Sequence, residues 1–91
     1  MDIKVFANFR DICGGKKVTL HIEEGQSIHS VLDDLTTEFP PMKEELFTDK
    51  KELKPMIHVF INGRNIIHLD GLETKLKVTD EVALFPPVAG G

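Results

Sequence analysis

Two runs near the start of the chain place apolar residues at every second position, the pattern of a strand that is buried on one face. The first run covers residues 3–9 and the second covers residues 17–22. Between them, Cys13, Gly14 and Gly15 favour a turn, because glycine adopts a positive φ without a clash at Cβ. The two runs are therefore predicted to form a β-hairpin. The residues expected to face inward are Ile3, Val5, Ala7, Phe9, Val18, Leu20 and Ile22.

The next segment changes to a helical spacing. Ser27 is suited to the helix N-cap, because its hydroxyl can accept a hydrogen bond from a free backbone N–H. The apolar stripe that follows consists of Ile28, Val31, Leu32, Leu35 and Phe39. Pro40 and Pro41 end the predicted helix, since neither can donate a backbone hydrogen bond. Residues 42–47 are a candidate short helical turn, and the charged residues 48–54 are interpreted as a solvated connector.

The second half of the chain contains further strand signals. Residues 57–61 are a strand closed by the turn residues Asn62 and Gly63, residues 65–69 are a candidate short strand, and residues 81–85 are the final strand. This order predicts an α+β fold, a roll of the β-grasp type in which one main helix crosses one face of a mixed sheet of four to five strands. The opposite face of the sheet is left open to solvent or partners.

The composition fits a single small domain. The chain has 91 residues, of which 41% are hydrophobic and 29% charged, and its formal net charge is −4. The acidic balance argues against a nucleic-acid partner. No apolar run approaches the ~20 residues of a membrane span, and no signal-peptide segment is recognisable, so no membrane partner is expected. The single cysteine, Cys13, excludes an internal disulfide and suits a reducing compartment, so a cytoplasmic location is expected.

Residues able to carry chemistry inside the domain are sparse. The four histidines lack metal-ligand spacing and Cys13 has no CxxC partner, so no metal site is expected. The GxxxxGK[ST] motif of a phosphate-binding loop is absent, so any ATP that the protein needs must be bound by another protein. Arg10 and Arg64 are either surface charges or residues that hold the C-terminus or meet acidic groups on a partner.

Three of the six phenylalanines are expected on the open face of the sheet. Phe6, Phe60 and Phe85 each alternate with the inward-facing residues of their strands. These strands are neighbours in a β-grasp sheet, so the three rings are predicted to form one patch. Contiguous exposed aromatic surface is typical of a docking site. The alternatives are that the rings are ordinary scattered surface residues or that a bulge turns one of them inward.

The end of the chain is its most informative feature. The last six residues are Pro86, Pro87, Val88, Ala89, Gly90 and Gly91. We divide the chain into a β-grasp domain at residues 1–85 and a flexible tail at residues 86–91. The prolines restrict the tail to an extended path that reaches at most ~20 Å. Because the glycines leave no side chain beside the terminal carboxylate, such a tail can enter a narrow tunnel and present that carboxylate to a nucleotide phosphate. A frayed terminus without function is the alternative.

The sequence of the tail resembles a known family. Residues 80–91, which end in Phe-Pro-Pro-Val-Ala-Gly-Gly, closely resemble the C-terminal signature of the MoaD-like sulfur carriers. This family includes the small subunit of molybdopterin synthase and the small archaeal modifier proteins. Residues 6–15 resemble its first strand and turn, and residues 41–47, 60–64 and 69–71 resemble its archaeal branch. The resemblance spans the whole chain, with one departure: Val-Thr precedes Asp80 where an Asp-Gly turn is common in the family.

The resemblance implies a ubiquitin-like β-grasp fold and a protein that acts through its own C-terminus. An adenylating enzyme of the ubiquitin-activating type would use ATP to adenylate the Gly91 carboxylate, and sulfur delivered through that enzyme would give a thiocarboxylate. With the large subunit of molybdopterin synthase, this sulfur would enter the molybdenum or tungsten cofactor. The protein would bind no cofactor and would not be catalytic alone, but would be the sulfur-donating subunit of a molybdopterin-synthase-like complex.

Other functions share the same tail. In conjugating relatives a lysine of a target protein attacks the activated glycine, so a protein modifier is one alternative, and a sulfur carrier for tRNA thiolation is another. A non-catalytic interaction module that uses only the phenylalanine patch is a third. The residues expected to act at the reactive terminus are Gly90 and Gly91, and those expected to bind partners are Phe6, Phe60, Phe85, Pro86, Pro87, Val88, Ala89, Arg10 and Arg64.

Overall fold

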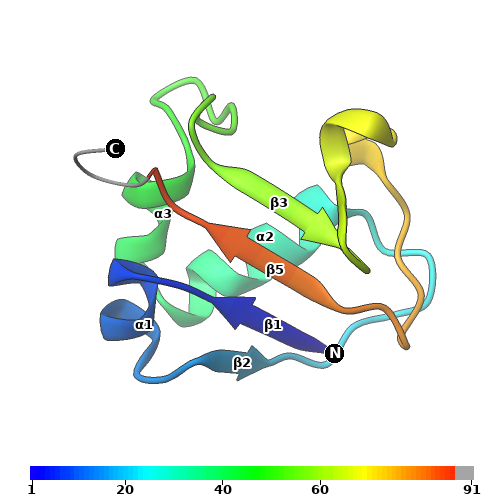
Figure 1. Cartoon of the computed structure of the whole chain (residues 1–91), viewed down its shortest axis with the longest axis horizontal. Coiled ribbons are helices and arrows are strands. Elements are labelled where there is room, and N and C mark those ends of the chain that lie inside the picture. The colour runs from blue at the N-terminus through cyan, green and yellow to red at the C-terminus, as the bar shows by residue number, and fades with distance from the viewer. Residues whose placement is uncertain (88–91) are drawn as a thin grey trace.

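The computed structural model describes residues 1–87, which form a five-stranded sheet with helices on one side (Figure 1). The strands lie side by side in the order β2-β1-β5-β3-β4. The predicted β-grasp architecture, a mixed sheet crossed by one main helix, is therefore confirmed. In chain order the elements are β1 (Asp2–Val5), α1 (Asn8–Cys13), β2 (Lys17–Thr19), α2 (Ile28–Glu38), α3 (Pro41–Leu46), β3 (His58–Ile61), β4 (Arg64–Asn65), the short 3₁₀ helices η1 (Ile66–His68) and η2 (Gly71–Glu73), and β5 (Val82–Phe85).

The last strand is the central one. β5 runs parallel to β1, with Ile3 opposite Val82, and antiparallel to β3, with Val59 opposite Leu84. β2 and β4 pair antiparallel with β1 and β3 at the two edges. The predicted antiparallel pairing of the first two strands is therefore correct, and the tail leaves from the middle of the sheet.

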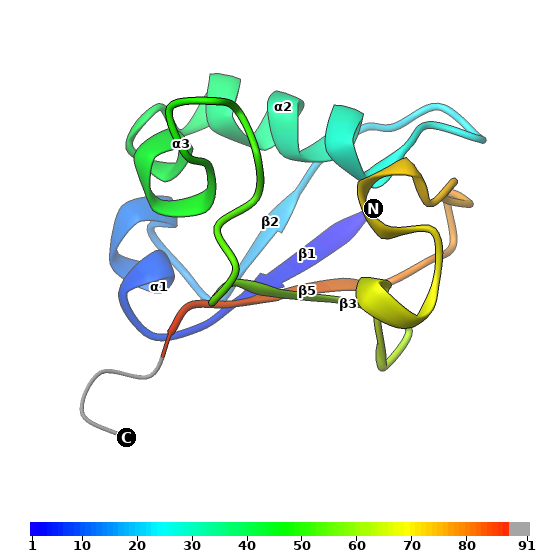
Figure 2. The same ribbon diagram turned by 90° about the horizontal axis from the view of Figure 1, so that it is seen from above.

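The three α-helices α1, α2 and α3 lie on one side of the sheet, as the view from above shows (Figure 2). α2 begins as predicted at Ser27, whose Oγ accepts a hydrogen bond from the backbone N–H of Ser30 at 3.2 Å. Fully burying one aliphatic side chain contributes about 1.5–3 kcal/mol, so the facing stripes of α2 and the sheet hold the two layers together. The side chains that are completely buried between these layers include Ile28, Val31, Leu32, Leu35, Ile3, Val5, Val59, Val82 and Leu84.

The first strand is shorter than its hydrophobic pattern predicts. β1 ends at Val5, and residues 8–13 form α1 instead of extending the strand. Ala7, predicted to face inward, is exposed and lies at φ 51° and ψ −132°, a conformation that turns the chain out of the sheet. Phe9 is buried as predicted, but it enters the core from α1. Gly14 supplies the predicted positive φ, at 75°, where it ends that helix.

Two other segments differ from their predicted bounds. Residues 65–69 are predicted to form a short strand, but only Asn65 belongs to β4 and the next three residues form η1. The Asn65 Oδ1 accepts a hydrogen bond from the backbone N–H of Ile67 at 3.1 Å, and this bond starts the 3₁₀ turn. β2 stops at Thr19, although Ile22 is buried beyond it. α2 ends before the prolines as predicted, and Pro41 then opens α3, since the first position of a helix needs no N–H.

Candidate functional site

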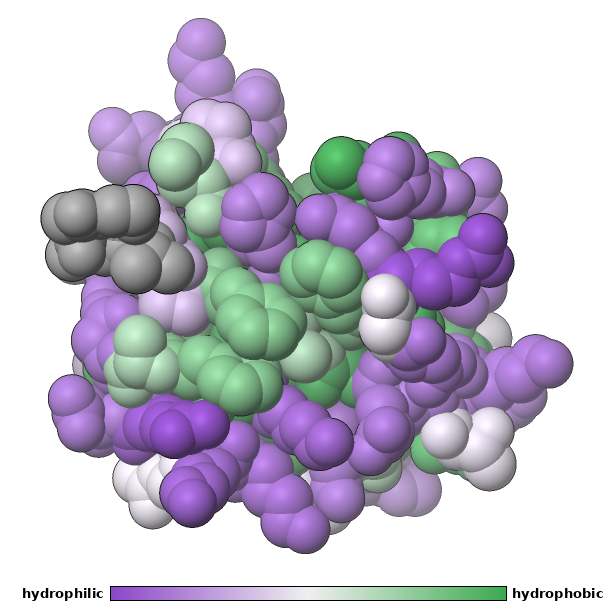
Figure 3. Space-filling view, viewed as in Figure 1, coloured by the Kyte–Doolittle hydropathy of each residue, from purple (hydrophilic) through white to green (hydrophobic). Residues whose placement is uncertain are grey.

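Three phenylalanine rings cover the face of the sheet that carries no helix (Figure 3). The rings of Phe6 and Phe85 are stacked, with their centroids 4.3 Å apart and their planes at 11°. Phe60 meets Phe85 edge-on, with centroids 5.3 Å apart and an angle of 80°. Such pairs contribute about 0.5–1.5 kcal/mol each beyond their burial. We call these three residues the aromatic cluster, and the prediction that they form one patch on the open face is confirmed.

The strand register explains why the rings meet. In the antiparallel pair of β3 and β5, Val59 lies opposite Leu84, and both side chains are buried beneath the helices. Because side chains alternate between the faces of a sheet, Phe60 and Phe85 point to the other side and remain half-buried. Phe6 follows the end of β1, the parallel neighbour of β5, and completes the cluster from the other flank.

The side chain of Arg10 packs against the ring of Phe6. Its guanidinium carbon lies 5.0 Å from the centroid of the Phe6 ring, a cation–π arrangement worth about 0.5–1 kcal/mol at exposed sites. Its Nε donates a hydrogen bond to the backbone carbonyl of Val5 at 2.9 Å. This contact is possible because the chain reverses at Ala7, where the N–H of Phe9 donates to the carbonyl of Phe6 at 3.1 Å. Arg10 is therefore fixed at the rim of the aromatic cluster.

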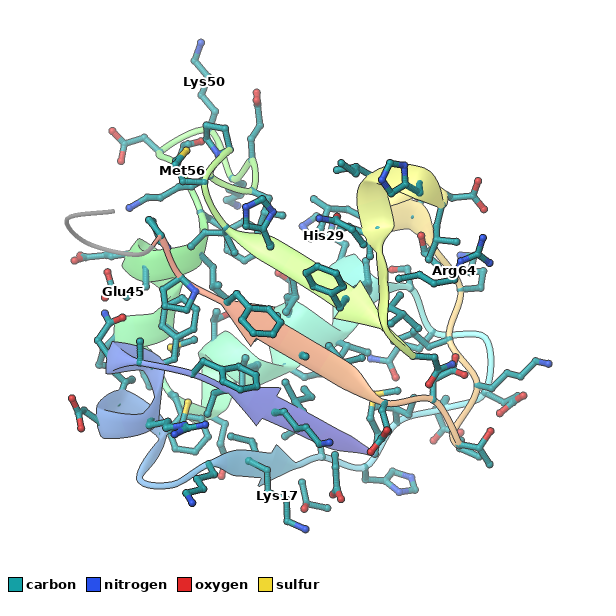
Figure 4. The ribbon with its side chains drawn as sticks, viewed as in Figure 1. Lys17, His29, Glu45, Lys50, Met56 and Arg64 are labelled. Carbon is teal, nitrogen blue, oxygen red and sulfur yellow. The ribbon has the colours of Figure 1, made fainter. Side chains whose placement is uncertain are left out.

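An open groove of about 1270 Å³ runs over the aromatic cluster, and all three rings line it. One wall is formed by Phe60, Phe85 and the prolines that follow β5. The other wall is formed by Pro55 and Met56, from the segment that leads into β3. Figure 4 shows Met56 above the start of β3 and Glu45 beside the end of β5. We call this feature the tail groove, because the chain leaves the sheet within it.

The root of the tail is part of this surface. Pro86 is buried and Pro87 is exposed, and both line the tail groove. Val88, Ala89, Gly90 and Gly91 lie outside the described residues, so the roles assigned to them stay predictions, as does the boundary between domain and tail. The described residues do bring the predicted docking patch and the start of the predicted tail to the same place. A partner that covers the aromatic cluster therefore lies next to the base of the tail.

This combination has known counterparts. The sequence profile of the ThiS family matches residues 3–91. The chain belongs to the ThiS family of ubiquitin-like proteins. Small archaeal modifier protein 3 of Haloferax volcanii is 37% identical to it over 91 residues, covering 100% of this chain and 98% of the relative. A protein of Archaeoglobus fulgidus that is proposed to be a sulfur carrier is 46% identical over 48 residues, which span 53% of this chain and 54% of the relative.

Solved structures of ThiS-family relatives have the same fold. The crystal structure of small archaeal modifier protein 1 from Haloferax volcanii superposes with a TM-score of 0.88 at 31% identity, covering 99% of this chain and 97% of that one. A Pyrococcus furiosus chain proposed to be subunit 1 of a molybdopterin converting factor has a TM-score of 0.76 at 27% identity, covering 96% and 95%. A chain of the BexX/CysO complex of Amycolatopsis orientalis has a TM-score of 0.84 at 26% identity, covering 99% and 98%.

The two arginines singled out from the sequence lie at different ends of this ThiS-family domain. Arg10 contacts the aromatic cluster. Arg64 is exposed on the edge strand β4, and Figure 4 shows it at the end of the sheet opposite to Glu45, which lines the tail groove. The structure therefore brings Arg10 together with the aromatic cluster and leaves Arg64 apart from it.

The remaining candidates for chemistry are dispersed. Within residues 1–87, no three His, Cys, Asp or Glu side chains converge as ligands for a metal ion. Cys13 is half-buried in α1, and burial raises the pKa of its thiol, which lowers its reactivity. None of the helices in this part of the chain is long and apolar enough to cross a membrane.

The second wall of the tail groove is not predicted by the sequence. Residues 48–54 are predicted to be a solvated connector, and Pro55 and Met56 have no predicted role. Met56 has 61% of its surface exposed, which is unusual for a large apolar residue. The only sequence signal was an apolar pair, Pro55 and Met56, placed between a charged run and a strand, and that pair could equally have been the start of the core.

Proposed function

We propose that this chain is a sulfur carrier of the molybdopterin-synthase type, which acts through a thiocarboxylate on Gly91. The observation that carries the proposal is the position of the aromatic cluster directly beside the root of the tail. An enzyme that docks on the cluster lies beside Pro86 and Pro87, from which the tail starts. The domain then provides the surface that the partner binds, and the reaction takes place in the active site of the partner.

The first chemical step activates the terminus. The Gly91 carboxylate attacks the α-phosphate of ATP bound by an adenylating enzyme, so an acyl–phosphate bond forms and pyrophosphate leaves. A hydrosulfide ion supplied through that enzyme then attacks the activated carbonyl carbon, the acyl–phosphate bond breaks, and AMP leaves. The product is the thiocarboxylate, whose sulfur the large subunit of molybdopterin synthase transfers to the pterin precursor. Glycine at positions 90 and 91 supports this scheme, because a chain without side chains fits a narrow active-site channel.

The relatives support the same scheme. A sulfur carrier in Archaeoglobus fulgidus and subunit 1 of a molybdopterin converting factor in Pyrococcus furiosus are the roles proposed for two of them, and CysO has been crystallised in complex with BexX. Each role requires a second protein that recognises the domain. The open aromatic cluster is the surface of this chain best suited to that recognition.

The proposal is tested by ATP–pyrophosphate exchange. Mixing the protein with ATP and the adenylating enzymes of its own cell should give exchange that depends on Gly91. Deleting Gly91, or adding one residue after it, should reduce exchange to background, because the terminal carboxylate is then displaced from the α-phosphate by the length of one residue. Substituting Lys50, which lies in the exposed loop after α3, by Ala is the matched control and should leave the rate unchanged.

Exchange that persists in the extended protein would show that the terminus is not the reacting group. Absence of exchange with every adenylating enzyme of the cell would contradict the activation step itself. Intact-mass analysis of the protein purified from that cell then identifies the product, since replacing one carboxylate oxygen by sulfur adds a defined mass.

A second function, a protein modifier joined to lysines, is favoured by one observation. Small archaeal modifier protein 3 is 37% identical along the entire chain, and it is named as a modifier. Both functions begin with adenylation of Gly91 and differ in the nucleophile that follows. Peptides in which a substrate lysine carries the residual Gly90-Gly91 remnant would establish conjugation, whereas the sulfur-for-oxygen mass change alone would establish the carrier.

A further inference from the structure

One wall of the tail groove is formed by the segment between α3 and β3, which is not part of the aromatic cluster. The backbone N–H of Lys54 donates to the carbonyl of Leu46 at 2.8 Å, and the N–H of Ile57 donates to the carbonyl of Lys54 at 3.0 Å. The Lys54 ammonium also donates to the carbonyl of Glu44 at 2.5 Å. These bonds tie the segment between α3 and β3 to the end of α3. The wall that Pro55 and Met56 form is therefore anchored to α3 through Lys54.

Met56 stands on this wall in an unusual position. It is 61% exposed, whereas Met42 in α3 is completely buried. Its side chain lines the same groove as Phe85 and Pro87. A methionine side chain is flexible and polarisable, so it adapts to an apolar group that enters beside it. The groove thus offers an apolar slot between Met56 and Phe85, beside the other rings of the aromatic cluster.

The rim of the groove carries charges of both signs. The chain has a net charge of −4, the cation Lys54 and the carboxylate Glu45 line the groove, and the cation Arg10 lies over the ring of Phe6. Within residues 1–87 neither cation forms an ion pair with a carboxylate. The one carboxylate on the lining, Glu45, already accepts a hydrogen bond from the side chain of Asn8 at 2.6 Å. The groove is therefore mostly apolar inside, and its rim offers the Lys54 ammonium, which forms no ion pair within the described residues, to a carboxylate of a partner.

We infer that the tail groove receives a segment of the adenylating enzyme that carries an apolar side chain next to an aspartate or glutamate. The apolar side chain enters between Met56 and Phe85, and the carboxylate reaches Lys54 at the rim. This inference rests on the proposed function, because it assigns a second contact to the same partner. It adds a site that selects the partner by the sequence of one segment, beyond the general attraction of the aromatic cluster.

Methyl NMR of the methionines tests the contact directly. Labelling with ¹³C-methyl methionine gives signals from Met1, Met42 and Met56, which differ in exposure and position. Adding the adenylating enzyme should shift or broaden the Met56 signal, with Met42 and Met1 as references inside the core and at the sheet edge. A Met56 signal that stays unchanged while the complex forms would overturn the inference.

Substitutions separate the two elements of the groove. Lys54→Glu should weaken binding of the enzyme about tenfold, since it places like charge against the incoming carboxylate. Lys50→Glu is the matched control, because Figure 4 shows Lys50 projecting from the loop away from the groove, and it should change the affinity less than about twofold. Met56→Glu should weaken binding about tenfold or more, whereas Met56→Leu should retain it. Equal effects of the two lysine substitutions would contradict the acidic segment.

The outcomes also distinguish this inference from the proposed function. If Phe85→Asp abolishes binding while the Met56 and Lys54 variants bind normally, the docking cluster stands and the groove contact is wrong. If the wild-type protein is not adenylated at all, the proposed function fails first. A Met56 signal that shifts with the concentration of the protein alone would show that a second copy fills the groove. A Met56 signal that shifts on deletion of residues 88–91 would show that the chain's own tail fills it; either result overturns the inference.

Discussion

The two faces of the sheet are both apolar but are built from different side chains. On the helix-covered face, Val59, Val82 and Leu84 are completely buried among the aliphatic side chains of the core. On the open face, Phe60 and Phe85, each one residue away from a core residue, are half-buried and contact each other. The comparison shows how a single alternating strand can stabilise the fold with one set of side chains and present a contact surface with the other.

The choice of residue type follows from this division. Aliphatic side chains pack densely when both layers enclose them. Aromatic rings gain from stacking on one another, so a cluster can stay ordered with one side exposed. The open face therefore keeps a fixed shape without a covering layer, which is what a docking surface requires. The helix-covered face is expected to control stability, and the open face to control binding.

The largest effect is expected on the covered face. Leu84→Ala removes a completely buried side chain and leaves a cavity, so it should lower the free energy of unfolding by about 2–5 kcal/mol. Urea denaturation monitored by circular dichroism measures the change. Phe85→Ala, at the next residue, should cost less, because its ring is half-exposed and loses only two aromatic contacts. Equal losses at the two positions would show that both faces are core.

The second largest effect is expected on binding of the adenylating enzyme to the open face. Phe6→Asp and Phe85→Asp should each weaken docking of the adenylating enzyme at least about tenfold, because truncating a central aromatic anchor commonly costs more than 1 kcal/mol. The isolated variants should stay folded, since the new carboxylate lies at the open face and remains solvated. Isothermal titration gives the affinity and circular dichroism gives the folded state. Thr37→Asp, on the exposed side of α2, is the control. Unfolding of either variant would assign that ring to the core.

A smaller effect on stability is expected at the turn that follows β1. Ala7 lies at φ 51° and ψ −132°, a region that suits glycine and strains a residue with a Cβ. Ala7→Gly relieves that strain but adds freedom to the unfolded chain, and the net gain should be about 1 kcal/mol of stability. Thermal unfolding measures it. A lower midpoint for Ala7→Gly would mean that the Cβ makes a contact worth more than the strain.

The smallest effect is expected at the edge of the sheet. The hydrogen bond from the Thr19 hydroxyl at 2.8 Å, together with the Lys17 ammonium, holds the pKa of Asp2 below its ordinary value of 3.8. Because folding lowers this pKa, the carboxylate stabilises the fold above the pKa of the unfolded chain. That contribution is lost as the pH falls through the folded-state value. Asp2→Asn should therefore flatten the acid side of the pH–stability curve slightly, measured against Asp49→Asn, and an unchanged curve would contradict this.

The open-face cluster could be predicted from the sequence, because it depends on alternation alone. Phe60 and Phe85 occupy regular strands that are long enough to fix which face each residue takes. Their meeting in space required only that β3 and β5 be neighbours, which the order of elements indicates. Ser27 as the N-cap of α2 was equally readable, since a capping hydroxyl acts on residues three positions away.

Phe9 shows the limit of that reasoning. Its spacing from Ile3 and Val5 fits a strand, and it is indeed buried, but it reaches the core from a helix that begins after a turn at Ala7. No residue type marks that turn, since alanine rarely adopts a positive φ. Short apolar runs do not distinguish one more strand residue from the start of a helix.

The tail groove could not be predicted for a different reason. Its outer wall is a loop whose position depends on hydrogen bonds from Lys54 to the backbone of α3. Met56 and Phe85 come together only through tertiary folding, and neither residue's local pattern refers to the other. The chemistry assigned to Gly91 came from a resemblance of the C-terminal sequence. The geometry of residues 1–87 adds the place from which that tail starts.

The position of β5 has a consequence for how the protein is made. Within residues 1–87, β5 is the last strand and the central strand of the sheet, and the strands on its two sides are joined only through it. Pairing Ile3 with Val82 links residues near the two ends of the described chain, and such distant contacts form late in folding. The sheet therefore stays open until this segment has been synthesised. Every molecule that completes its sheet has also brought Pro86 and Pro87 to the aromatic cluster, so the docking surface and the root of the tail are assembled in the same step.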